Sequence, residues 1–85
     1  MAEMSDHQDS EHFTYDRSWD DIEKMLDRAE RKQNEWVNAF FAAKNRDPKD
    51  RQTMADAARN KKALEGVIKT LRWVLGDKDV PHPLE

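Results

Sequence analysis

The amino-acid sequence predicts an all-α fold, an antiparallel two-helix hairpin of the coiled-coil type. Two apolar stripes recur in steps of three and four residues, the spacing of one face of an α-helix. A helix-start signal separates them, and Gly and Pro total only 2 and 3 in 85 residues, too few for the turns of an all-β fold. The first stripe comprises Trp19, Ile22, Leu26, Ala29, Gln33, Trp36, Phe40 and Ala43. The second comprises Met54, Ala57, Lys61, Leu64, Ile68, Leu71 and Leu75.

The first predicted helix spans residues 18–45. Ser18 is a preferred N-cap residue, and Asp20 and Asp21 follow in the first turn, where negative charge suits the helix dipole. Ser18 and Asp21 also have the spacing of a capping box. Because no Gly or Pro interrupts the segment, we expect one continuous helix about 42 Å long.

The second predicted helix spans residues 48–75. Asp47 is a suitable N-cap, Pro48 suits the first helical position, and Asp50 lies in the first turn. Gly76 follows Leu75 directly, where a glycine commonly ends a helix. Since only a few residues separate the two helices, they are expected to be antiparallel neighbours.

Side-chain volume predicts the register of the hairpin. Folding about the turn pairs residues whose numbers sum to about 94. Trp36 then meets Ala57, and Ala29 meets Leu64, so large residues face small ones, as interdigitated packing requires. The polar residues of the two stripes, Gln33 and Lys61, also face each other. We interpret them as a register-fixing layer, with the Lys61 ammonium reaching Glu30 or Asn34.

The chain ends have a different character from residues 18–76, the predicted hairpin. Residues 1–17 hold five acidic residues and one basic residue, show no apolar period and are predicted to be a disordered acidic tail. Residues 77–85 form a C-terminal tail in which Pro81 and Pro83 prevent further helix. Its last two residues, Leu84-Glu85, are compatible with a native end or a cloning remnant.

Apolar residues beyond the two stripes are the candidate contact sites. A two-helix seam does not need them, and surplus apolar surface often marks an interface. We expect them to join two hairpins into a four-helix bundle as a homodimer, or to bind a larger partner protein. The alternative is that the tails cover them, through Phe13, Tyr15, Val80 and Leu84. The candidate partner-binding residues are Val37, Phe41, Val67, Trp73 and Val74.

A basic outer face on the second helix gives an alternative function. Residues 48–75 carry seven basic and three acidic residues, and phosphates of nucleic acid are the natural partners of such a face. The net charge of −3 and the acidic tails count against nucleic acid, because they repel the same phosphates. The candidate nucleic-acid contacts are Arg59, Lys62, Lys69 and Arg72.

Other chemistries find little support in the sequence. Cysteine is absent, and there is no Gly-rich phosphate loop, nucleophile elbow or His–Glu metal motif, so we predict no enzyme and no cofactor. His7, Asp9, Glu11 and His12 lack the spacing of a preformed metal site. No apolar run approaches the roughly 20 residues of a membrane span, and residues 1–6 are unlike a signal peptide. These features predict a cytoplasmic protein.

The end of the second helix carries a resemblance to a known group of proteins. Residues 62–77 read Lys-Ala-Leu-Glu-Gly-Val-Ile-Lys-Thr-Leu-Arg-Trp-Val-Leu-Gly-Asp. This segment resembles the C-terminal part of small helical proteins from phages of actinobacteria, and the likeness extends over about residues 18–77. Such proteins mostly have no assigned activity. The resemblance implies a phage accessory or host-interaction protein in the host cytoplasm, with a host or virion protein as partner, and supplies no catalytic residues.

Overall fold

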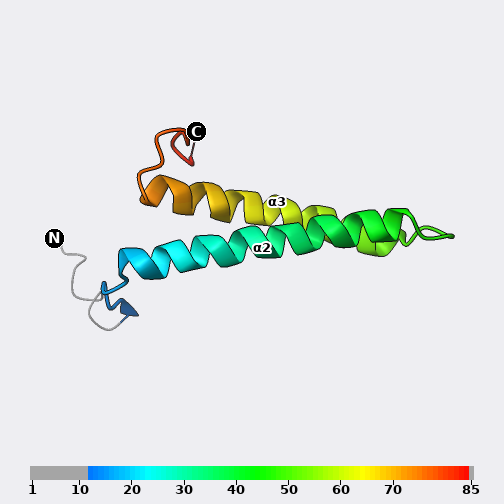
Figure 1. The fold of residues 1–85 in the computed structure, drawn as a ribbon, viewed down its shortest axis with the longest axis horizontal. Helices are drawn as coiled ribbons and strands as arrows, with labels where there is room; N and C mark the ends of the chain where they lie inside the picture. The colour runs from blue at the N-terminus through cyan, green and yellow to red at the C-terminus, as the bar shows by residue number, and fades with distance from the viewer. Residues whose placement is uncertain (1–11, 85) are drawn as a thin grey trace.

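The computed structural model describes residues 12–84, and two long helices dominate it (Figure 1). Helix α2 spans Trp19–Lys44 and helix α3 spans Arg51–Val74. The helices lie side by side and run in opposite directions, and the chain measures 60 × 27 × 25 Å along its principal axes. Residues 12–84 contain no strand. The predicted all-α hairpin is therefore confirmed.

Helix α2 begins where its capping signal predicted. The Ser18 hydroxyl accepts a hydrogen bond from the backbone N–H of Asp21 at 3.0 Å, and the Asp21 carboxylate accepts one from the backbone N–H of Ser18 at 3.1 Å. This reciprocal pair satisfies two N–H groups that a helix start otherwise leaves open. The bond from the Ser18 backbone also holds the pKa of Asp21 below its ordinary value.

Helix α3 begins three residues later than predicted, and its N-cap is Asp50 rather than Asp47. The Asp50 carboxylate accepts hydrogen bonds from the backbone N–H and the hydroxyl of Thr53, at 3.1 and 2.7 Å. The backbone N–H of Asp50 in turn donates to the carbonyl of Ala43 at 3.1 Å, which ties the connection to the end of α2. Pro48 lies in this connection, after a cis peptide bond. Both aspartates suit a cap, but only Asp50 has a threonine three residues later.

Helix α3 ends at the predicted glycine. Gly76 has a φ of 83°, the left-handed region that residues with a Cβ adopt only under strain. The N–H of Gly76 bonds to the carbonyl of Trp73, and the N–H of Asp77 bonds to the carbonyl of Arg72, both at 3.0 Å. These two bonds form a Schellman motif, which satisfies the last carbonyls of the helix.

The predicted register of the hairpin is confirmed, but its polar layer is built differently. Gln33 donates a hydrogen bond across the seam to Lys61 at 3.5 Å, and the numbers of these two residues sum to 94. The acceptor is the Lys61 backbone carbonyl, however, and the Lys61 ammonium lies 3.4 Å from Glu65 on its own helix. The prediction that this ammonium reaches Glu30 or Asn34 is therefore wrong. Glu30 pairs instead with Arg72.

The core of the hairpin is thin. Among residues 12–84 the buried apolar residues are Ala29, Ala43 and Ala57, which are 5%, 3% and 0% exposed. Alanines allow the two backbones to approach closely, but they remove little apolar surface from water. Larger members of the two stripes are half-buried, and Trp19, which the stripe placed in the seam, is 66% exposed. The seam therefore leaves Trp19, at the open end of the hairpin, largely uncovered.

The two tails behave differently. Residues 1–11 of the predicted acidic tail lie outside the described residues, and Phe13 and Tyr15 are exposed and contact each other. The C-terminal tail turns back alongside α3 (Figure 1). Its His82 ring meets Trp73 edge-on, with ring centroids 5.2 Å apart. Among the described residues, the C-terminal tail covers part of α3, while Trp19 at the open end of the seam is exposed.

Candidate interaction surfaces

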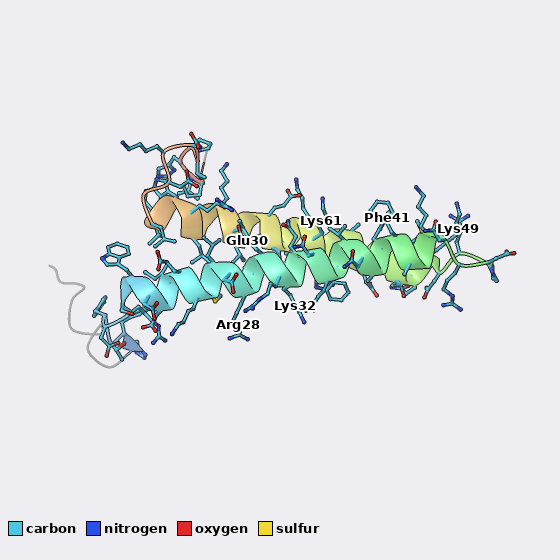
Figure 2. The ribbon with its side chains drawn as sticks, viewed as in Figure 1. Arg28, Glu30, Lys32, Phe41, Lys49 and Lys61 are labelled. Atoms are coloured by element: carbon cyan, nitrogen blue, oxygen red, sulfur yellow. The ribbon has the colours of Figure 1, made fainter. Side chains whose placement is uncertain are left out.

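The helices present two different sides, one on each flank of the seam. The tail side is where the C-terminal tail folds back, and Arg72 pairs there with Glu30 of α2. Residues two apart on a helix are about 200° apart around its axis, so Val67 and Glu65, both on α3, lie on opposite flanks of the seam. In Figure 2, Arg28 and Lys32 project from α2 opposite to Glu30. The tail side comprises Glu30, Val37, Phe41, Lys61, Glu65 and Arg72. The Val67 side comprises Met25, Lys32, Asn60, Val67 and Val74.

The five predicted contact residues do not form one patch. Val37 and Phe41 lie together on the tail side, close to the turn of the hairpin. Val67 and Val74 are seven residues apart on the opposite side, and both are 37% exposed. Trp73 lies on the outer surface of α3, against His82 of the tail. All except the half-buried Val37 are exposed, but they serve at least two separate surfaces.

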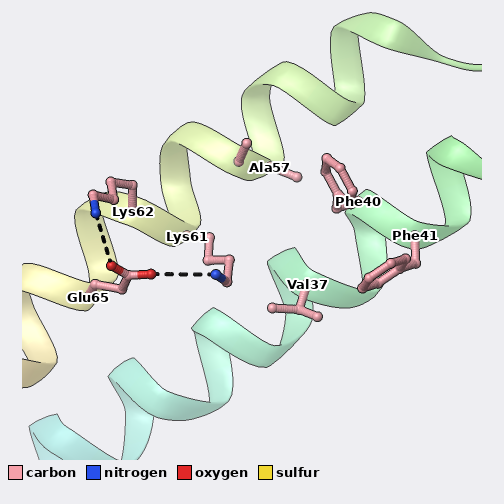
Figure 3. Close-up of a pocket in the computed structure, with 8 residues that line it drawn as sticks. Val37, Phe40, Phe41, Ala57, Lys61, Lys62 and Glu65 are labelled. Carbon is pink, nitrogen blue, oxygen red and sulfur yellow. Dashed lines mark hydrogen bonds and ion pairs between the residues drawn. The ribbon is translucent and has the colours of Figure 1, made fainter.

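An apolar groove of about 320 Å³ lies on the tail side. Val37, Phe40 and Phe41 of α2 form one wall, and Ala57 and Ala58 of α3 form the other (Figure 3). The alanines create this hollow, because they leave the space opposite the phenylalanine rings unfilled. The groove suits an apolar side chain of a partner.

A charged rim at one end of this groove consists of two lysines that share one glutamate. The ammonium groups of Lys61 and Lys62 both lie 3.4 Å from the Glu65 carboxylate, as the dashed lines in Figure 3 show. The hydrogen bond from Lys62 holds the pKa of Glu65 below its ordinary value. Glu65 therefore carries no proton at neutral pH, and the groove lining contains no other carboxylate and no Ser, Thr, Cys or His side chain.

A second hollow lies beside the Val67 side, near the open end of the hairpin. It measures about 540 Å³, and its apolar lining consists of Ile22, Met25 and Leu71. Met25 is 51% exposed, as exposed as Phe41, yet it does not stand among the predicted contact residues. Its position three residues after the stripe residue Ile22 was the available signal, because this spacing places Met25 beside the seam. The basic residues at the edge are Arg17, Lys24 and Arg28.

The predicted basic face is largely paired with acidic residues. Arg59 lies 2.7 Å from Asp56, and Lys62 lies 3.4 Å from Glu65. Arg72 joins α3 to α2 through Glu30 and also contacts Asp77 at 3.2 Å, and the bond with Glu30 raises its pKa. These pairs reduce the positive charge that the face offers to phosphates. Lys69 lies beside the C-terminal tail.

The described part of the chain offers neither a metal cluster nor a membrane-spanning helix. Residues 12–84 contain no group of three His, Cys, Asp or Glu side chains placed to hold a metal ion. Most of the candidate metal cluster, His7, Asp9 and Glu11, lies outside these residues. Neither described helix has an apolar stretch that could cross a membrane.

Comparisons with protein-family models, curated proteins and solved structures found no match to this chain. The resemblance of residues 62–77 to small helical proteins of actinobacterial phages therefore stays a prediction.

Proposed function

We propose that this chain is a non-enzymatic helical protein that acts through protein–protein contacts. The observation that carries the proposal is the mismatch between its core and its surface. In residues 12–84 the buried apolar side chains are all alanines, while Met25, Phe41 and Trp73 are 51%, 51% and 45% exposed. Covering apolar surface yields about 25 cal/mol per Å². A partner can therefore supply stabilisation that the hairpin alone does not.

The polar groups around the hollows support a binding role rather than a catalytic one. Glu65 at the groove holds two lysines, and Arg72 holds Glu30 and Asp77. Groups engaged in this way shape a surface and fix the hairpin, and the ion pairs move the pKa of Glu65 down and that of Arg72 up, away from the neutral range that acid–base catalysis uses. The groove beside Phe41 is the natural receptor for an apolar anchor of a partner.

The biological setting is proposed from the resemblance of residues 62–77. A small accessory protein of an actinobacterial phage would act in the host cytoplasm, and its partner would be a second copy, a host protein or a virion protein. An alanine seam with apolar flanks is compatible with each of these partners. Nucleic-acid binding through Lys69 and its neighbours remains the alternative, and the ion pairs of that face weaken it.

Photocross-linking in intact cells tests the proposal. A benzophenone amino acid is placed at Phe41 or Trp73, and at the exposed positions Asp27 and Gln52 as controls. We expect discrete protein adducts from the apolar positions and none from the controls, because only covered residues lie against a partner. The mass of the adduct then separates a second copy from another protein. Absence of adducts from both apolar positions would contradict contact with a partner through the groove beside Phe41 and through the Trp73 surface.

A further inference from the structure

The Val67 side is the hairpin surface that residues 77–84 of the C-terminal tail leave uncovered. The C-terminal tail lies on the other side, where Val80 and Pro81 line a hollow with Ile68 and Arg72. That side also carries the ion pair between Arg72 and Glu30. On the Val67 side, the open half of the hairpin carries the apolar residues of the hollow beside Met25 together with the charged side chains at that hollow, and small or polar residues follow toward the turn. The charged residues are Arg17, Asp21, Lys24 and Arg28. The other residues of this side are Met25, Lys32 and Ala39 on α2, and Asn60, Val67 and Val74 on α3.

The spacing of these residues makes the surface complementary to itself. A two-fold axis parallel to the long axis of the hairpin would place α2 against α3 of a second copy, antiparallel and at the same height as within one chain. The hydrogen bond between Gln33 and Lys61 shows that residues whose numbers sum to about 94 lie at the same height along the hairpin. Met25 would then meet Val67 of the second copy, and Lys32 would meet Asn60. The exposed apolar residues Met25 and Val67 therefore meet each other, Val74 lies level with the start of α2, and the polar pair repeats the kind of layer found within the seam.

The size of this surface fits a stable dimer. Helix α2 has 26 residues, which gives a length of about 39 Å. Two helices packed 8–10 Å apart present a face about 20 Å wide, so the face covers on the order of 800 Å². This is the area that each partner of a standard protein interface contributes. The long side chain of Arg28 can reach solvent from the edge of such a bundle.

We propose that a second copy of this chain docks on the Val67 side and forms a four-helix bundle with its two-fold axis parallel to the hairpins. The inference rests on the proposed function, because it names the partner of one exposed surface. It leaves the groove beside Phe41 on the outside of the dimer, available to a further protein. Met25 and Val67 become buried in the bundle, and Val37 does not.

Solution mass of the full chain tests the dimer. A chain of 10.0 kDa should sediment as a species of twice that mass at tens of micromolar and dissociate on dilution. Val67→Glu should weaken association at least tenfold, because it buries a charge against the second copy. Val37→Glu is the matched control on the tail side and should leave association unchanged. Circular dichroism checks that both variants keep their helix content. A monomer at every concentration, or equal loss with both variants, would overturn the proposal.

Cross-linking tests the arrangement, and the absence of native cysteine makes this simple. A tagged Met25→Cys chain mixed with an untagged Val67→Cys chain should form a disulfide-linked pair on oxidation. The control mixture of Val37→Cys and Val67→Cys should not. A dimer without the first cross-link would refute the parallel axis. If the chain is monomeric but photocross-links from Phe41 capture another protein, this inference fails while the proposed function stands.

Discussion

Replacing Ala57 with glycine tests whether the alanine seam holds the hairpin together. Ala57 is fully buried between the helices, so the change removes a methyl group worth about 0.8 kcal/mol. Glycine within a helix costs about a further 0.8–1.0 kcal/mol relative to alanine. The expected total is about 2 kcal/mol of unfolding free energy. For a chain of this size, that lowers the melting temperature by roughly 8–16 °C.

Ala55 provides the matched control for this variant. It lies in the same helix, half a turn away, but its side chain is exposed. Ala55→Gly should therefore lose only the helix-propensity contribution, about 1 kcal/mol. Thermal and urea unfolding, followed by circular dichroism at one protein concentration, measure both variants while association contributes equally. Equal costs for the two substitutions would show that Ala57 is not buried in solution, and the alanine seam would be refuted.

The two glycines should respond to alanine with opposite signs. Gly66→Ala should stabilise by about 1 kcal/mol, because the glycine lies within a helix with open space around its Cβ position. Gly76→Ala should destabilise by about 1 kcal/mol, since its φ of 83° strains any residue with a Cβ; melting curves that move together would contradict this. The hydrogen bonds from Thr53 hold the pKa of Asp50 below its ordinary value of 3.8. Its carboxylate therefore stabilises the fold above pH 3.8, and this contribution is lost as the pH falls through the lower folded pKa. Asp50→Asn keeps a capping residue but removes this titration, so its stability should decline less steeply with acid; identical acid unfolding curves would count against the cap. Finally, the chain should leave duplex DNA unshifted in a gel at low salt, because three of its four basic-face residues are paired. A retarded band that disappears with Lys69→Ala would favour the nucleic-acid alternative.

Local signals predicted most of the helix boundaries. Ser18 with Asp21 and Gly76 after Leu75 act through bonds between residues close in sequence, and each occurs as expected. The start of α3 was misplaced because two aspartates compete for the cap. Asp50 is the N-cap because Thr53 donates two hydrogen bonds to its carboxylate. The backbone N–H of Asp50 donates a third to the carbonyl of Ala43, which belongs to the other helix.

The sequence by itself determined the two helices, their antiparallel order and their register. These follow from spacing along the chain and from the short connection, so no distant contact is needed to infer them. The tertiary structure alone decided which exposed apolar residues share a surface. In the structure Phe41 and Val67 lie on different sides, Arg72 forms an ion pair with Glu30, and Lys61 forms one with Glu65. These outcomes depend on the rotation of each helix about its axis and on where the tail folds back, and stripe spacing constrains neither tightly.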